Sequence, residues 1–432
     1  MKTTSRKSLP ACIALMGTLL GESAGGEEVR SSDSLRRVDS AMVLLWSSEA
    51  TNTIVTVGGV FACRAAVYKG IVHSAIYDAV VGIEGGYEPY AKHLAAQAGA
   101  SADAAVAQAA HDVLVAQFPA QRARLDGLLV TSLAFVPDGV SESSGRDFGK
   151  AVAEDILTLR ANDNLESDPP YTPSSGPGAW VPGPGPIGVG LGLARPLVLL
   201  TGAQFRPNGP PALDSSQYAT GLEEVRQIGA VSSVTRTAGQ TDAGLFYVEH
   251  AVPQFTRALG RLAIEKRLTR LQTARMLALT AIASGDACIA CFEAKYHYSF
   301  WRPITAIRNA STSPDPAWSP LIGTPNHPSY PSAHGCYTAG VTESLAGFFR
   351  RDEVSFSVDS TSSGTTHTFP RFSALLREVM NARVWGGIHF RSDDEDGAAI
   401  GSSVAHWLEQ NFLRPIGRQA VPSSDESAEA GR

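Results

Sequence analysis

The stretch "TRLQTARMLALTAIASGDACIACFEAKY" (residues 269–296) has the pattern of a long buried helix. Apolar residues recur at intervals of three and four, which places them on one helical face. Its most apolar part, residues 276–292, contains Asp286 and is shorter than the uninterrupted apolar run that a membrane span requires. We therefore expect a core helix of a globular domain, with no membrane span in the mature chain.

The same helical periodicity recurs elsewhere, in residues 64–83, 101–118, 120–135, 149–162 and 396–413. Strand signals are few. One occurs in "VSFSVDSTSSGTTHTF" (354–369), where two alternating runs flank a turn rich in Ser and Gly. The chain is thus predicted to be all-α with a minor β-hairpin.

Residues 163–212 differ from the rest because Pro and Gly exclude both helix and regular sheet. A loop this long within a compact domain is usually functional or disordered, and its Trp and Tyr indicate that it covers the site. Residues 1–25 have the layout of a signal peptide, which predicts a secreted or periplasmic protein. The tail at 414–432 is predicted to be disordered.

Composition narrows the possible partners and cofactors. The chain has 432 residues and a formal net charge of −6, which argues against a nucleic-acid binder. Its motif "CIAC" (288–291) has no second CxxC partner, so we expect buried thiols rather than a zinc site. The composition predicts no particular oligomeric state.

The segment "KYHYSFWRP" (295–303) carries two cations in an aromatic setting. Lys295 and Arg302 are seven residues apart, so a continuous helix would place both on one face, two turns apart. Such a pair is either an ordinary solvated stripe or a pair directed at an anion. The aromatic residues would make the surroundings apolar where they are not simply core.

The segment "HPSYPSAHGCYTAG" (327–340) contains a helix start. Pro331 followed by Ser332 is typical of an N-cap, with His334 in the first turn. The N–H groups of Ser332, Ala333 and His334 would then be free donors at the positive end of a helix dipole. This arrangement predicts an oxyanion site.

The segment "ARVWGGIHFRSD" (382–393) supplies Arg383, His389 and Asp393. The last two are four residues apart, so on a helix the carboxylate could accept from one imidazole nitrogen, set its tautomer and raise its basicity. Each feature alone is common in structural contexts. Together, the three segments supply the cations and imidazoles that suit a tetrahedral oxyanion with several negative charges. No carboxylate cluster accompanies them, which argues against a magnesium-dependent phosphoryl site.

The order and spacing of these residues resemble the three-part signature of vanadium-dependent haloperoxidases and type-2 phosphatidic acid phosphatases. The matching elements are Lys295-x6-Arg302-Pro303, Pro331-Ser332-x-His334 and Arg383-x5-His389-x3-Asp393. Further stretches resemble the soluble bacterial and plant branch, over roughly residues 40–413: "IVHSAIYDAVVGI", "GAQFRPNGPPALDS" and "SSVTRTAGQT". Ala333 stands where the family usually has Gly, and Ala382 stands where it usually has Ser.

The resemblance implies a single all-α domain at 40–413, built from two packed helical bundles with active-site segments at 295–393. It also implies roles: Lys295, Arg302, Arg383, Ser332 and Ala333 would bind the oxyanion. His389 would be the axial ligand of vanadate, oriented by Asp393, and His334 would be the acid/base. Lys295 would further polarise bound peroxide.

Three functions remain open on this resemblance. The first is a vanadate-dependent haloperoxidase that oxidises halide with hydrogen peroxide. The second is a soluble acid phosphatase that needs no vanadate and acts on a phosphomonoester through a phosphohistidine. The third is an oxyanion-binding protein without turnover. In the family, His327 resembles a position linked to halide choice, where His accompanies bromide oxidation and Phe accompanies chloride oxidation.

Overall fold

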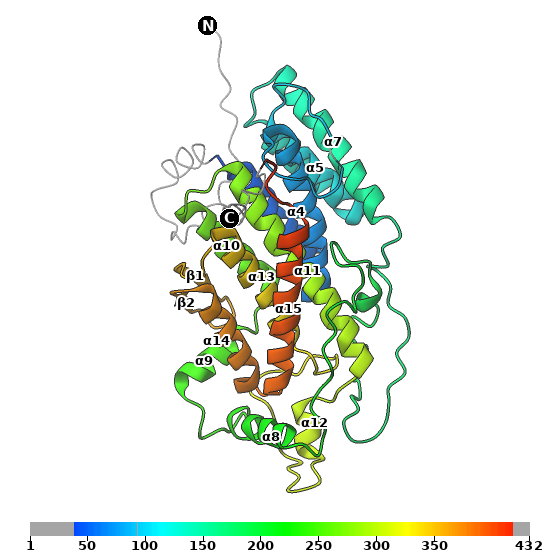
Figure 1. Cartoon of the computed structure of the whole chain (residues 1–432), viewed down its shortest axis with the longest axis vertical. Coiled ribbons are helices and arrows are strands. Elements are labelled where there is room, and N and C mark those ends of the chain that lie inside the picture. The colour runs from blue at the N-terminus through cyan, green and yellow to red at the C-terminus, as the bar shows by residue number, and fades with distance from the viewer. Residues whose placement is uncertain (1–38, 93, 418–432) are drawn as a thin grey trace, which may run out of the picture.

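The computed structural model describes residues 39–92 and 94–417 (Figure 1). The predicted signal peptide at 1–25 lies outside the described residues, as does the predicted tail beyond residue 417. Among the described residues, helices dominate and the regular sheet is a single two-stranded hairpin. The all-α fold with a minor hairpin is therefore confirmed.

The first helical bundle comes from the N-terminal part of the chain (Figure 1). Its helices pack around an apolar core rich in Ala and Val, which lets their backbones approach closely. They are α3 (Ala41–Thr51), α4 (Ala62–Glu84), α5 (Ala102–Gln117), α6 (Arg122–Leu133) and α7 (Val140–Arg160), with a π-helix at Asn52–Val57 and a 3-10 turn at Pro119–Gln121.

The second bundle contains the last helices of the chain, namely α11 (Arg270–Tyr298), α13 (Ala333–Phe349), α14 (Phe372–Trp385) and α15 (Arg391–Asn411). The short helix α12 (Pro303–Arg308) precedes α13. Strands β1 (Phe356–Asp359) and β2 (Thr366–Phe369) form the predicted antiparallel hairpin. Three helices connect the bundles along the chain: α8 (Ser216–Ile228), α9 (Ala238–Phe246) and α10 (Ala251–Glu265).

Helix α11 joins the two bundles, because it packs against α4 on one side and against α13 and α15 on the other. Among the described helices it alone has the length and apolar composition of a membrane span, but 94% of its most apolar window is buried inside the protein. Burial between two bundles explains why it is apolar on all sides. The prediction of a buried core helix at 269–296 is confirmed.

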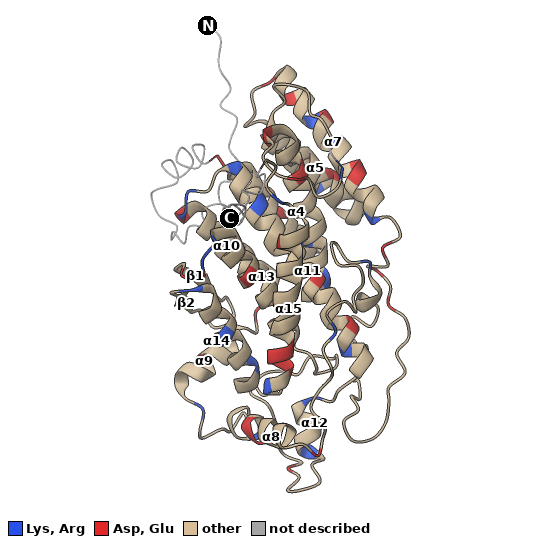
Figure 2. Ribbon diagram, in the orientation of Figure 1, with Lys and Arg blue, Asp and Glu red and all other residues tan. Residues whose placement is uncertain are grey.

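Two predicted helices begin earlier than the sequence indicated. Helix α7 starts at Val140 rather than at residue 149, and α15 starts at Arg391 rather than at residue 396. Both early turns are rich in polar residues, which weakens the apolar periodicity. In α15 these include Asp393 and Asp394, and Figure 2 shows acidic residues at the end where this helix begins. Carboxylates are favoured there by the helix dipole.

The irregular segment 163–212 is attached to α11 by a buried carboxylate. Asp286 accepts hydrogen bonds from the backbone N–H groups of Leu197, Val198 and Leu199, at 2.6, 2.8 and 2.9 Å. Just after the end of α11, the Ser299 carbonyl accepts from the backbone N–H of Trp180, and the backbone N–H of Trp301 donates to the Gly178 carbonyl. The segment therefore covers the C-terminal end of α11 and the residues that lead to Arg302.

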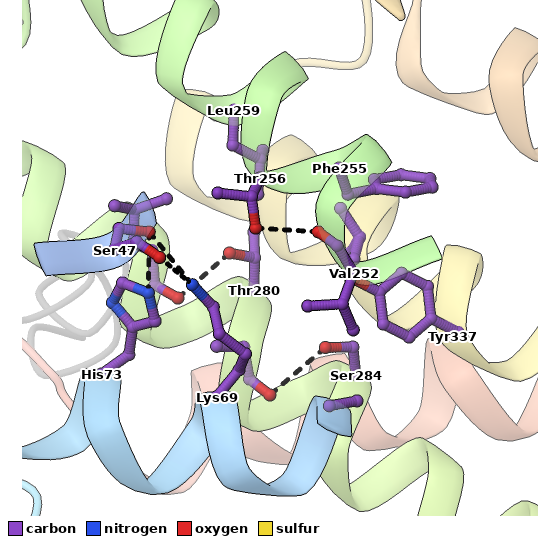
Figure 3. A pocket seen from close by; sticks show the side chains of 14 residues that line it. Ser47, Lys69, His73, Val252, Phe255, Thr256, Leu259, Thr280, Ser284 and Tyr337 are labelled. Carbon is purple, nitrogen blue, oxygen red and sulfur yellow. Dashed lines mark hydrogen bonds between the residues drawn. The ribbon is translucent and has the colours of Figure 1, made fainter. Parts of the chain in front are cut away.

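A buried lysine, Lys69, connects α3 with α4 in the first bundle (Figure 3). Its ammonium donates to the Ser47 carbonyl at 2.6 Å, to the Ser47 hydroxyl at 3.2 Å and to the Thr51 hydroxyl at 3.0 Å. The neighbouring cavity measures about 30 Å³, room for about one water molecule. Since all three protons of Lys69 have acceptors, we assign it a structural role.

The four described cysteines are free and buried: Cys63, Cys288, Cys291 and Cys336. No group of three or more His, Cys, Asp or Glu within the described part of the chain is arranged to hold a metal ion. The "CIAC" motif lies inside α11, where its thiols are part of the core. This agrees with the prediction of buried thiols.

We predict that Asp286→Ala lowers the free energy of unfolding by about 2–5 kcal/mol, because it leaves three buried N–H groups without an acceptor. Chemical denaturation monitored by circular dichroism would measure this loss. The control is Asp315→Ala, which removes a half-buried carboxylate whose side chain contacts only its own turn. Equal stability of the two variants would contradict the anchoring role.

Candidate active site

The two cations of the first segment do not lie on one helix, so that prediction is wrong. Helix α11 ends at Tyr298, with Ser299 in a left-handed conformation (φ 48°), and Arg302 is the N-cap of α12. The chain bends between them, yet both side chains are buried, at 0% and 2% exposure for Lys295 and Arg302. Burial excludes the solvated stripe and supports two cations directed into the protein.

Backbone carbonyls hold Lys295, whose ammonium donates to Pro328 and Ser329, both at 2.8 Å. One of its three protons therefore remains available. Burial is the main cause that lowers the pKa of Lys295, to about 8, and its charge is retained at neutral pH.

Arg302 contacts both other segments. Its Nε donates to the His327 carbonyl at 2.9 Å, and Nη1 donates to the Ile388 carbonyl at 2.8 Å. Nη1 also lies 3.1 Å from Nε2 of His389, while Nη2 lies 3.0 Å from Nδ1 of His327. Since a guanidinium only donates, Nε2 of His389 must be an unprotonated acceptor. Nδ1 of His327 lies between this guanidinium and the Pro328 carbonyl, which is 3.2 Å away. Burial lowers the pKa of Arg302 to about 9.

His389 and Asp393 form the expected pair, with Nδ1 and Oδ2 separated by 2.9 Å. They do not share a helix: His389 precedes α15, whereas Asp393 lies in the first turn of that helix. The same carboxylate oxygen accepts from the Ser329 hydroxyl at 2.5 Å and from the Phe390 N–H at 3.2 Å. Nδ1 of His389 therefore carries the proton, and its Nε2 lone pair faces Arg302.

The electrostatic effect on His389 differs from our expectation. We expected Asp393 to raise the basicity of the imidazole. Burial instead holds the pKa of His389 well below its ordinary value, and the positive charges of Arg302 and Lys295 act in the same direction. Burial also raises the pKa of Asp393, to about 6. His389 is thus a neutral imidazole with a free electron pair on Nε2.

Ser332 is the N-cap of α13, as predicted, and accepts from the Gly335 N–H. Its own N–H is not free, however, because it donates to the Asp393 carbonyl at 2.7 Å. The N–H groups of Ala333 and His334 have no acceptor among the described residues. Ala333 does not have a positive φ, so the Gly that the family usually carries here is not needed for a left-handed conformation.

His334 lies in the first turn of α13 and is half-buried. Burial holds its pKa well below the ordinary value, and the charges of Arg383 and Lys295 lower it further. A backbone hydrogen bond with Tyr247 acts in the opposite direction. A neutral imidazole next to free helix N–H groups is able to accept a proton at neutral pH.

Arg383 lies on α14 and is 3% exposed. Its Nη1 donates to the Tyr247 carbonyl at 2.9 Å, whereas its buried Nε has no partner among the described residues. Burial lowers its pKa to about 10, and the nearby charge of Asp394 opposes this effect. Burial holds the pKa of Asp394 well above its ordinary value, and the nearby charge of Arg383 opposes this effect.

The structure therefore brings the predicted site residues together from three segments. Sequence reasoning missed two residues: Ser329, which donates to Asp393, and Tyr247, whose carbonyl accepts from Arg383. The presence of Ser329 two residues after His327 is only a weak sequence signal of a site residue. A contact made by a backbone carbonyl, such as that of Tyr247, leaves no signal in the sequence. His327 lies beside Arg302, with its ring 5.2 Å from that of Phe292.

An oxyanion with several negative charges fits this arrangement. Three buried cations surround His389, and among the described residues the unpartnered Nε of Arg383 and two helix N–H groups offer free donors. Charge-assisted hydrogen bonds of these kinds are typical of phosphate and vanadate sites. Among these groups, the neutral imidazole of His389 has a free lone pair on Nε2, which makes it a suitable ligand for vanadium(V) or a nucleophile toward phosphorus.

Comparisons with known proteins agree with this site. Residues 275–417, which include all three segments, match the family described as VCPO second helical-bundle domain. A vanadium chloroperoxidase from Curvularia inaequalis is 23% identical over 294 residues, which is 52% of this chain and 47% of that protein. The match thus spans about half the length of this curated relative.

Solved structures show the same fold. A bacterial vanadium-dependent iodoperoxidase superposes with a TM-score of 0.76 at 23% identity, covering 88% of this chain and 98% of that one. A holo-type bacterial vanadium-dependent chloroperoxidase gives a TM-score of 0.63 at 16% identity, covering 80% and 90%. The family match, the curated relative and the solved structures together support the vanadium haloperoxidase superfamily for this chain, and its fold is that of the bacterial haloperoxidases.

We predict that Arg302→Ala and Arg383→Ala each weaken binding of inorganic phosphate by about 1.5–3 kcal/mol, because each removes a charge-assisted donor. Isothermal titration calorimetry would measure the affinities. The control is Arg160→Ala, since Arg160 is a buried arginine of the first bundle that binds the carbonyls of Pro196 and Arg195. Unchanged affinity in both site variants would leave the arginines with a structural role only.

Proposed function

We propose that this protein is a vanadate-dependent haloperoxidase that oxidises halide with hydrogen peroxide. The observation that carries the proposal is the neutral His389, paired with Asp393 and enclosed by Lys295, Arg302 and Arg383. The named relatives support it, since they are described as vanadium-dependent chloroperoxidases and an iodoperoxidase.

The residues would divide the work of holding vanadate. Nε2 of His389 would be its protein ligand, with Asp393 fixing the tautomer through Nδ1. Lys295 has one proton left to donate, Arg383 has its Nε, and Ala333 has its backbone N–H. Arg302 would lose its hydrogen bond to Nε2 of His389, and its positive charge would then stabilise the bound oxyanion. When bound, vanadate supplies a Lewis acid that activates hydrogen peroxide toward halide.

His334 would then move protons. It is neutral because burial and nearby cations hold its pKa down, so it can take a proton from incoming peroxide and return it to a leaving oxygen. Its position in the first turn of α13 places it next to the free N–H of Ala333. Lys295, the deepest cation, would stabilise negative charge that develops on oxygen.

An acid phosphatase is the second candidate, and one observation favours it. The Nε2 lone pair of His389 is directed at a cation and is free of a proton, as a nucleophile toward phosphorus must be. The same cations would stabilise the charge on the phosphoryl oxygens, and His334 would protonate the leaving oxygen.

One preparation can separate the candidate functions. After incubation with orthovanadate, the protein would be assayed for bound vanadium, for peroxide-dependent bromination and for hydrolysis of p-nitrophenyl phosphate. The proposal expects bound vanadium and bromination. Hydrolysis without bromination would favour the phosphatase, and vanadium binding with neither activity would indicate an oxyanion-binding protein.

We predict that the two histidines fail in different ways. His389→Ala should lose bound vanadium and all activity together, because it removes the protein ligand. His334→Ala should keep much of its vanadium but lose turnover by about 10²–10⁴-fold, the usual contribution of an acid/base group. Vanadium content, bromination rate and melting temperature would be measured on each variant. A folded His389→Ala that holds vanadate as tightly as the parent would contradict the role assignment.

A further prediction concerns halide choice. We expect turnover of bromide or iodide without appreciable turnover of chloride. The polar imidazole of His327 contacts Arg302, and it would hydrate this part of the site and disfavour the harder oxidation. Rates with the three halides at moderately acidic pH would test this. The comparison variant is His327→Phe, which should raise chloride turnover relative to bromide. Chloride oxidation by the parent at the rate of bromide would count against the expectation.

A further inference from the structure

The position of Arg383 depends on one residue outside the three segments. Tyr247 follows α9 and is 2% exposed. Its carbonyl accepts from Nη1 of Arg383 at 2.9 Å, which is the sole hydrogen bond of the Arg383 side chain among the described residues. A guanidinium held at one point can rotate about it unless its acceptor is itself fixed.

The acceptor is fixed through the side chain of the same tyrosine. The Tyr247 hydroxyl donates to Oε1 of Glu378 at 2.9 Å. Glu378 and Arg383 are both on α14, so Tyr247 contacts this helix at two places, through its hydroxyl and through its carbonyl. Burial is the main cause that raises the pKa of Tyr247 well above its ordinary value, and the hydroxyl therefore remains a donor.

A histidine of the hairpin completes the arrangement. His367 on β2 has Nδ1 2.6 Å from Oε1 of Glu378 and Nε2 2.8 Å from Oδ2 of Asp242 on α9. Two carboxylates at the two ring nitrogens are both satisfied only by an imidazolium. The ring also stacks on Phe246, the residue before Tyr247, with centroids 4.0 Å apart and planes 20° apart.

We propose that Tyr247 is a positioning residue for the oxyanion site, which aims Arg383 and is itself held by Glu378 and His367. The inference rests on the proposed function, because it assumes that Arg383 binds an oxyanion. It adds three residues outside the signature segments, and it makes the small β-hairpin part of the support of the site. A purely structural role would predict lower stability of variants, with no specific link to Arg383.

Tyr247→Phe keeps the carbonyl and removes the hydroxyl that anchors it. We expect this variant to bind inorganic orthovanadate about 3–10-fold more weakly, which is within the net range for the loss of one hydrogen bond. Glu378→Ala should weaken binding similarly, whereas Glu378→Gln retains an acceptor oxygen for the hydroxyl and should recover part of the affinity. Melting temperatures would be recorded for all three variants.

A double-mutant cycle tests whether Tyr247 acts through Arg383. The Tyr247→Phe loss should disappear when Arg383→Ala is already present, and it should persist in the Arg302→Ala background. Equal losses in the two backgrounds would overturn the inference, as would unchanged affinity of Tyr247→Phe in the parent. If the parent itself binds no orthovanadate, the proposed function fails first and the inference falls with it.

The chain offers a matched control for the histidine. His111 in the first bundle also lies between two carboxylates, with Nδ1 2.7 Å from Asp112 and Nε2 2.8 Å from Asp126. His367→Gln should weaken orthovanadate binding by about 2–5-fold, the range for one hydrogen bond, while His111→Gln should leave it unchanged. A similar loss in both variants would mean that the effect is general destabilisation, and would overturn the role of His367.

Discussion

Asp393 joins the second and third segments of the site, and the position of His389 relative to α13 depends on it. Its carbonyl accepts from Ser332 at the start of α13, and its carboxylate accepts from His389 and Ser329. Because Asp393 lies in the first turn of α15, the rigid end of a long helix fixes all these partners at once. The free N–H groups of α13 and the lone pair of His389 therefore have a set relative position before any ligand arrives.

The cations of the site keep their charge because carbonyls hold them, rather than paired carboxylates. Lys295 is held by two carbonyls, Arg302 by two, and Arg383 by one. Carbonyls orient a cation without cancelling its charge, so the charge remains available to an anion. Burial lowers the pKa of these groups to about 8, 9 and 10, respectively, which still leaves them protonated at neutral pH. Lys69 shows the contrast, since a buried lysine with every proton satisfied has no donor left for a ligand.

The sequence was informative where a pattern is local. Helical periodicity predicted α4, α5, α6, α7, α11 and α15, and the alternating runs around a Ser/Gly turn predicted the hairpin. The Pro331–Ser332 pair predicted the start of α13, because a cap depends on a few adjacent residues. The family resemblance predicted which side chains come together, but it did not predict the backbone geometry or the hydrogen bonds that hold them there. The end of α11 depends on a left-handed Ser299, which periodicity does not reveal, and so Lys295 and Arg302 were wrongly placed on one helix. Contacts to carbonyls, such as that of Tyr247, arise from tertiary packing and carry no residue-type signal.

The contact between Arg302 and His389 bears on how a ligand enters. Nε2 of His389 already accepts a hydrogen bond from Arg302, so any group that binds Nε2 must replace that bond. The replacement is not a net loss of contacts for the guanidinium, because the Nη1 proton released by Nε2 can donate to the incoming anion while the bonds to the His327 and Ile388 carbonyls persist. A neutral ligand would displace the same hydrogen bond without offering the cation a negative partner. Arg302 thus favours anionic ligands at His389, and this preference is shared by vanadate and phosphate chemistry. The two chemistries must therefore be distinguished by groups around this shared core. His327 is one such group, because its Nδ1 lies 3.0 Å from Nη2 of Arg302.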